Sequence, residues 1–266
     1  MRNVQLILVN TIRDLLSKKT VYFLLFATIG IAMLAGSGLS TVFSMQESTD
    51  PAALLAQKAN VLSEILQLWG LFTILFAIIY SAIAMYSEKK NRSIVSILAK
   101  PIARWEFLLG KWLGVLLFFL AFLLIGILAV LVFMIIWDIS FTALFWTGIM
   151  YRISEMVVFS GLAFMLSQFI NMILGGGISF VFWAFGTQFQ NLIDSSYWYV
   201  DWIGTIGYYL GPAQITDRII KDGILNNVLN PDFALYWSVI GENILYAVVV
   251  FYIGAVLFTR KDIQLN

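Results

Sequence analysis

The sequence holds few side chains that could carry out chemistry. Its 266 residues include no histidine and no cysteine. This excludes a Ser-His-Asp triad, a thiolate nucleophile, a disulfide and a metal site built on imidazole or sulfur. No G-x-x-x-x-G-K-[ST] run occurs, so the chain has no P-loop for a nucleotide. We therefore expect a protein that is not an enzyme by itself, with no catalytic, cofactor-binding or metal-binding residues.

The composition indicates where such a chain folds. Apolar residues make up 61% of it and charged residues 12%, with a mean hydropathy of +0.91, whereas soluble domains carry about 25% charged residues. So much apolar surface does not fit inside one water-soluble globule. The sequence predicts an all-α polytopic membrane protein with a single transmembrane domain over residues 1–266.

One long polar stretch interrupts the first half of the chain. Residues 87–111 hold six of the sixteen Lys and Arg residues and lie between two long apolar runs, which predicts a cytoplasmic loop. Within the loop, a short helix is expected to group four apolar side chains on one side, namely Ile94, Val95, Ile97 and Leu98. Pro101 ends that helix, and a new helix starts at Arg104 and continues into the next span. The apolar side contacts either lipid headgroups and neighbouring loops or a soluble partner.

Hydropathy predicts six transmembrane helices, each long enough to cross a bilayer. We place them at about residues 21–43, 65–86, 112–137, 148–167, 173–193 and 239–258. Residues 1–19 have apolar positions at helical spacing and are expected to form an interfacial helix that lies flat among the headgroups. Residues 194–236 are expected to form an extracytoplasmic segment, with a second interfacial helix from Pro212 onward, before the last span.

Local patterns add detail to the spans. Asp50 followed by Pro51 predicts a helix start outside the membrane that continues into the second span. Residues 141–147 are apolar but short, which indicates an interfacial segment. The glycine triplet 175–177 indicates a bend or a close helix contact, and the aromatic residues between 197 and 209 are typical of a membrane boundary.

The distribution of positive charge agrees with six spans. Twelve Lys and Arg residues fall in the predicted cytoplasmic segments, and three fall outside, at Lys58, Arg218 and Lys221. The positive-inside rule requires this asymmetry and places both termini in the cytoplasm. The sixteenth cation, Arg152, lies within the predicted fourth span.

Arg152 and Glu155 form a possible intramembrane pair. Their i, i+3 spacing allows them to meet on one helix face, and an ionisable group inside a span is by default a functional-site hypothesis. The alternative is a self-neutralising pair near the outer interface, with Arg152 extending outward to the headgroups. We prefer the alternative, because a charge one turn from the end of a span costs little.

The charged loop resembles a known family. After Glu88, the run S-I-V-S-I-L-A-K-P-I-A-R-W-E-F-L-L-G-K is similar to the signature of type-2 ABC exporter permeases, through Pro101, Arg104, Glu106, Gly110 and Lys111. In that family the loop carries the coupling helix, which sits in a groove of a separate ATP-binding subunit. The "YYLGP" run and the tail LFTRKDI resemble the branch that serves nitrous-oxide-reductase maturation.

The resemblance implies the permease subunit of an ATP-driven exporter in a prokaryotic plasma membrane. The docking residues would be Glu88, Lys89, Arg92, Ile94, Val95, Ile97, Leu98, Pro101 and Arg104. The implied partners are two copies of the ATP-binding subunit, which would hold ATP and Mg, a second permease copy that is identical or similar, and membrane lipid. The aromatic outer segment indicates either an extracytoplasmic partner or anchoring at the membrane boundary. No nucleic acid is expected.

Other functions remain open from the residues alone. An ion-coupled secondary carrier, or another polytopic protein without an ATPase partner, is the main alternative, although such carriers normally show internal repeats and no convincing repeat is evident. A membrane enzyme would need His, Cys or clustered carboxylates at one depth. The branch resemblance raises copper passage, but only nine scattered methionines offer soft ligands, and methionine in apolar helices more often packs.

Overall fold

The computed structural model describes residues 2–17, 51–90, 103–193, 197–214 and 231–260, together with a few helical residues in the gaps. In this part of the chain there are seven α-helices and no strands, as the sequence predicts. In chain order the helices are α1 (Arg2–Ser17), α3 (Pro51–Lys90), α5 (Arg104–Ile136), α6 (Ala143–Phe169), α7 (Met172–Leu192), α8 (Trp198–Leu210) and α10 (Phe233–Arg260).

Five of these helices are long and apolar enough to cross a membrane. They contain the segments Leu54–Tyr86, Arg104–Ile136, Ala143–Phe169, Met172–Phe189 and Phe233–Thr259. They correspond to the second to sixth predicted spans. The first predicted span, 21–43, falls almost wholly outside the described residues. The chain is therefore a multi-pass helical membrane protein, and the six-span layout as a whole stays a prediction.

The start of each span depends on local capping chemistry. α3 begins at Pro51, as the Asp50-Pro51 pair predicts, and runs without interruption into the second span. α6 begins at Ala143, because Thr142 acts as its N-cap and accepts a hydrogen bond from the backbone N–H of Phe145 at 3.1 Å. The expectation that residues 141–147 are interfacial is therefore wrong for the part from Ala143, which is the first turn of a span.

α10 also begins earlier than predicted, at Phe233 instead of residue 239. The side chain of Asp232 accepts a hydrogen bond from the backbone N–H of Leu235 at 3.1 Å. A carboxylate in this position satisfies one of the free N–H groups of the first turn. The Pro231-Asp232 pair is thus a helix-start signal, which hydropathy alone overlooks.

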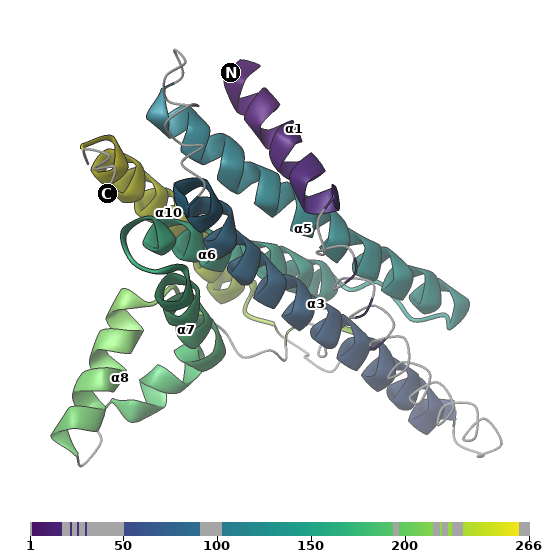
Figure 1. Cartoon of the computed structure of the whole chain (residues 1–266). Helices are drawn as coiled ribbons and strands as arrows, with labels where there is room; N and C mark the ends of the chain where they lie inside the picture. Colours follow the sequence, from purple (N-terminus) through teal and green to yellow (C-terminus); the bar gives the residue numbers. More distant parts are fainter. Residues whose placement is uncertain are drawn as a thin grey trace.

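α1 is a helix, as predicted, but it packs lengthwise along the first half of α5 (Figure 1). If a side chain replaced the hydrogen of Gly110, its Cβ would lie 2.9 Å from the Cβ of Ile7, and a Cβ at Gly114 would lie 2.6 Å from the Cβ of Thr11. Both distances are too short for a side chain, so the helices touch at these glycines. The two helices therefore run in the same direction in close contact. The predicted helix would lie flat across the ends of the spans, whereas α1 lies along a span. The two glycines of α5 allow this, because they form a groove parallel to the axis of α5 in which α1 packs.

α6 occupies the centre of the bundle and packs against α3, α5, α7 and α10. Twenty of its 27 residues are buried. Many of the buried positions are small or weakly polar, which lets helices approach closely where lipid provides no hydrophobic driving force between them.

The aromatic stretch after residue 197 forms the helix α8, which the sequence did not predict as a helix. α8 runs antiparallel to α7, because Gly204 contacts Leu192 while Gly207 contacts Phe189. Several of its aromatic side chains are exposed, with Trp198 and Tyr209 each 76% exposed. Figure 1 shows the two helices as a hairpin beside the bundle. The interfacial helix expected from Pro212 onward lies largely outside the described residues.

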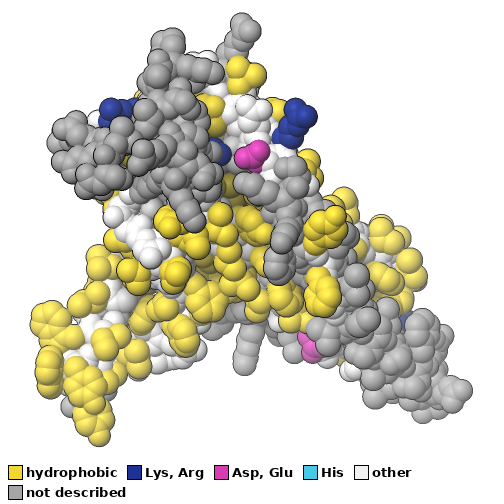
Figure 2. Space-filling model, viewed as in Figure 1, with side chains coloured by type: hydrophobic (Ala, Val, Ile, Leu, Met, Phe, Trp, Pro, Cys, Tyr) yellow, Lys and Arg dark blue, Asp and Glu magenta, His cyan; other side chains and the backbone are white. Residues whose placement is uncertain are grey.

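Basic and apolar side chains are distributed unevenly over the described surface. Figure 2 shows Lys and Arg side chains gathered mainly at the end of the molecule where α1 begins, with apolar side chains over most of the described surface beyond them. Basic residues at one end and an apolar middle are the arrangement that the positive-inside rule predicts for a cytoplasmic face.

The glycine triplet 175–177 lies at the start of α7, directly after the turn from α6. A Cβ on Gly175 would lie 2.8 Å from the backbone nitrogen of Ser167 in α6, whereas nothing lies within 4 Å of one on Gly177. The close helix contact expected from the triplet is confirmed at Gly175.

Two matched substitutions test this contact. Alanine normally stabilises a helix relative to glycine by about 1 kcal/mol, so Gly177→Ala is expected to leave the melting temperature unchanged or higher. Gly175→Ala is expected to lower it, because overpacking against fixed backbone costs about 1–3 kcal/mol. Tryptophan fluorescence of the purified protein in detergent measures both. Equal melting temperatures for the two variants would show that α7 does not need a glycine at position 175.

Candidate functional site

The first candidate site is the end of the bundle that carries the loop 87–111. Of the nine predicted docking residues, Arg104 is the one whose side chain is described. Glu88 and Lys89 lie in the last turn of α3 without described side chains, and the others lie outside the described residues. The expected new helix from Arg104 into the third span is confirmed, because α5 is continuous from that residue to Ile136. The docking role of the loop stays a prediction.

The helix ends beside this loop are joined to one another by hydrogen bonds. A guanidinium nitrogen of Arg104 donates to the backbone carbonyl of Thr259 at 3.1 Å, which links the start of α5 to the end of α10. The Asn3 amide donates to the Glu106 carboxylate at 3.2 Å, which links α5 to the start of α1. Glu106 also lies in the first turn of α5, where the helix dipole favours an anion.

These contacts account for several residues of the family signature. Arg104 and Glu106 tie helix ends together, and Gly110 admits the side chain of Ile7 from α1. Lys111 is buried, with 8% of its surface exposed. The signature thus marks the place where α1, α5 and α10 meet.

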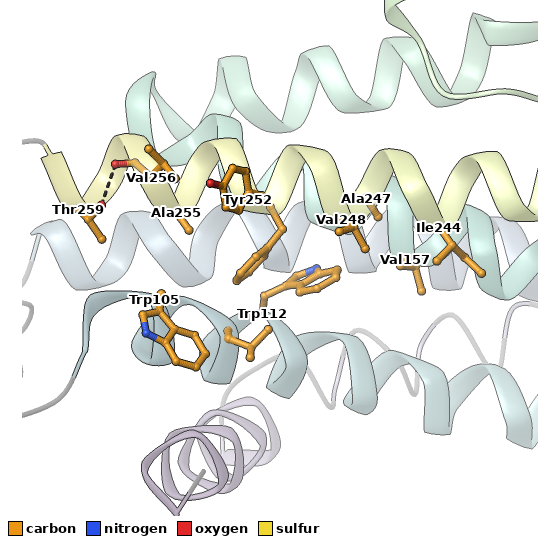
Figure 3. Close-up of a pocket in the computed structure, with 12 residues that line it drawn as sticks. Trp105, Trp112, Val157, Ile244, Ala247, Val248, Tyr252, Ala255, Val256 and Thr259 are labelled. Atoms are coloured by element: carbon orange, nitrogen blue, oxygen red, sulfur yellow. Dashed lines mark hydrogen bonds between the residues drawn. The ribbon is translucent and has the colours of Figure 1, made fainter.

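An apolar groove of about 570 Å³ runs between α5, α6 and α10 at the same end (Figure 3). Trp112 lies at its base, with its ring centroid 5.4 Å from that of Phe251 and its indole N–H donating to the hydroxyl of Ser160 at 3.3 Å. Trp105 and Thr259 mark its outer end. None of the described residues that line the groove is charged, so its chemistry suits an alkyl chain or an aromatic ring.

The second candidate site is the pair Arg152 and Glu155 in α6. A guanidinium nitrogen of Arg152 lies 2.8 Å from a carboxylate oxygen of Glu155, and the two residues are only 5% and 4% exposed. The structure therefore brings the two charges together inside the bundle. An ion pair in such surroundings is costly unless both partners are well hydrogen-bonded.

The expected outward extension of Arg152 is wrong. α6 begins at Ala143, so Arg152 lies nine residues into the helix, which is about 14 Å along its axis. Its side chain lies against α3, where a Cβ on Gly70 would be 3.7 Å from the guanidinium Nε atom. The arginine therefore lies beside Gly70 of α3, and its charge stays inside the protein.

One polar side chain of α10 contacts α6 at Ser154, the residue before Glu155. The amide of Asn243 donates to the hydroxyl of Ser154 at 3.4 Å, and its carbonyl oxygen is buried without a hydrogen bond from any described residue. Sequence reasoning missed both Asn243 and its neighbour Glu242. The signal for both was present in the sequence, because an acidic residue and an amide are unusual inside a predicted span such as 239–258.

The described residues show no group of three or more acidic side chains that could hold a metal ion. Whether the Arg152–Glu155 pair lines a transport pathway stays a prediction, because its position inside the bundle fits a structural role equally well.

Comparison with known proteins identifies one family. A model described as "ABC-2 family transporter protein" matches residues 12–195. The matched region contains α3, α5, α6 and α7, and with them the loop 87–111 and the Arg152–Glu155 pair. No curated protein matches the chain. The description names no branch, so the resemblance to the nitrous-oxide-reductase maturation branch stays a prediction.

Charge removal tests what the pair contributes to stability. Arg152→Met or Glu155→Leu alone is expected to lower the melting temperature strongly, because taking away one partner of a buried ion pair costs about 3–5 kcal/mol. The double variant is expected to recover most of the loss, since neither charge then stays buried. Thermal unfolding in detergent measures all three.

Arg13→Met is the matched control, because Arg13 is exposed on α1, and we expect no change in its melting temperature. A loss in the double variant equal to the sum of the two single losses would mean that the two side chains act independently of each other.

Proposed function

The chain belongs to the ABC-2 family of transporter proteins and is a membrane-spanning permease subunit; we propose that a separate ATP-binding subunit drives it, through the loop 87–111, as an exporter. Family membership favours this function over the ion-coupled carrier that the sequence also allows. The sequence has no P-loop, so ATP and Mg would be held by the partner subunit.

The observation that carries the proposal is the continuity of the helices on both sides of the loop. α3 has 40 residues and α5 has 33, which correspond to about 60 and 50 Å of helix. Each leads from the loop to the opposite end of the bundle. A displacement of the loop would therefore move two helices along their full length.

The hydrogen bonds at this end would spread the movement further. Arg104 links α5 to α10, and Glu106 links α5 to α1. A partner that moves the start of α5 would therefore also act on the two terminal helices. These links also support a topology with both termini in the cytoplasm, because they hold the start of α1 and the end of α10 beside a loop rich in Lys and Arg.

In the proposed mechanism, the apolar side of the helix before Pro101 is held in a groove of the ATP-binding subunit. Two such subunits close on ATP and separate after hydrolysis, so two permease copies are required, either identical or similar. Each closure tilts the spans and switches the pathway between inward-facing and outward-facing states. ATP shifts this equilibrium because the closed pair of subunits binds one of the two permease states better than the other.

Acidic substitutions in the loop test the coupling. Ile97→Asp or Leu98→Asp is expected to reduce permease-stimulated ATP hydrolysis at least about ten-fold, because burying a carboxylate in an apolar groove costs more than the 1.4 kcal/mol that corresponds to this factor. The measurement is the ATPase activity of the reconstituted complex in liposomes.

Two controls accompany these variants. Ile97→Val keeps the apolar surface and is expected to keep the stimulation. Leu55→Asp places the same charge at an exposed position near the other end of α3 and is expected to leave it unchanged. Full stimulation with Ile97→Asp and Leu98→Asp, in variants that insert normally, would rule out docking through this helix.

A further inference from the structure

A second cavity, of about 880 Å³, lies between α7, α8 and α10, away from the loop 87–111. Glu242 of α10 lines this cavity, and Thr259 lies at the end of α10 beside the loop. The two residues are 17 positions apart, which corresponds to about 25 Å of helix. The residues with polar or aromatic groups that matter here are Gln188, Asn191, Tyr208, Tyr209, Glu242 and Tyr246. Unlike the groove in Figure 3, this cavity is lined by polar as well as apolar groups.

The walls of the cavity are tied together by specific contacts. The amide of Gln214 donates to the backbone carbonyls of Phe182 at 2.9 Å and of Trp183 at 3.2 Å. Gly186 allows this approach, because a Cβ there would lie 2.5 Å from the Gln214 amide. The hydroxyl of Tyr246 donates to the carbonyl of Leu210 at 2.8 Å and links α10 to the end of α8. The cavity therefore has a defined shape.

Glu242 gives the cavity its charge. The residue lies nine positions into α10, within a segment apolar enough to span a membrane, yet its side chain is exposed. A carboxylate facing lipid at that depth would be costly, and such groups normally face water-filled cavities. Among the described residues, no basic side chain lines this cavity, and Glu242 forms no ion pair with any of them. The described lining therefore makes the cavity anionic.

Tyrosine rings add a second feature that favours cations. Tyr208, Tyr209 and Tyr246 line the cavity from two helices, and the face of an aromatic ring attracts a positive charge through its quadrupole. Gln188 and Asn191 supply amide groups, joined by a hydrogen bond of 3.2 Å. The volume falls in the range of about 300–1,000 Å³ that is usual for small-molecule sites.

We propose that this cavity is a binding site for an organic cation, with the positive charge held between Glu242 and the tyrosine rings and the apolar body of the ligand against the remaining wall. The site is at the end of the bundle away from the loop, which predicts entry from the extracytoplasmic side. Binding there does not depend on the coupling to an ATP-binding subunit, so the two proposals can fail independently.

Equilibrium dialysis with the full-length chain in nanodiscs tests the site. The probe is tetraphenylphosphonium, and the counter-probe is tetraphenylborate, an anion of nearly the same size and shape; empty nanodiscs correct for partition into lipid. We expect saturable binding of the cation and none of the anion. Equal binding of the two probes would overturn the proposal, because the site would then select for apolar surface alone.

Substitutions locate the binding. Glu242→Gln is expected to raise the Kd for the cation about ten-fold or more, whereas Glu242→Asp, which keeps the charge, retains most of the affinity. Tyr208→Leu is expected to raise the Kd about five-fold, and Tyr208→Phe to leave it unchanged. An unchanged Kd with Glu242→Gln would overturn the proposal.

Trp202→Leu is the matched control, because Trp202 is an exposed aromatic residue of the same helix, α8, that does not line the cavity. Its Kd is expected to equal that of the unaltered chain. A loss of binding with this variant as large as with Tyr208→Leu would assign the probe to the outer aromatic surface and overturn the proposal. Melting temperatures of all variants identify any loss that comes from misfolding.

Discussion

Close packing around α6 is the constraint on which the arrangement of the other spans depends. Lipid is as apolar as the side chains, so helices in a membrane associate through contact and hydrogen bonding. A glycine lies at each contact between α6 and a neighbouring helix. Three of these glycines belong to the neighbours, namely Gly70 of α3, Gly175 of α7 and Gly254 of α10. The fourth is Gly161 of α6 itself, which faces α5. At the tightest of these contacts, a Cβ on Gly254 would lie 2.4 Å from the sulfur of Met165.

This packing explains how α6 can hold charge in the middle of the bundle. Arg152 and Glu155 are enclosed by α6 and its neighbours, so the pair is kept from lipid by protein on all sides. A buried ion pair is weak evidence for stability, because an apolar pair of similar volume is often as stable or more so. The pair favours registers of α3 and α6 that keep both charges enclosed, because a charge that faces lipid is costly.

α10 connects two chemically different ends of the molecule. Its last turn is joined to the start of α5 beside the basic loop, and its first half lines the anionic cavity with α7 and α8. The apolar groove lies along its second half. A rotation or tilt of α10 would alter all three regions at once, because the helix is continuous from Phe233 to Arg260. This single helix is therefore the most direct physical connection between the two proposed sites.

The sequence by itself determined the class of the protein and most of its helices. Hydropathy, charge asymmetry and the Asp50-Pro51 start are local signals, and a bilayer requires each span to satisfy its own backbone hydrogen bonds. Only the tertiary structure decided that α1 lies along α5, that residues 198–210 form a helix on α7, that Arg152 is buried and that Glu242 faces a cavity. Each of these depends on which face of a helix meets its neighbour. Apolar residues cover nearly every face of these helices, so hydrophobic periodicity carries little information about which face meets a neighbour. That face is instead determined by contacts at glycines between segments that are distant in the sequence.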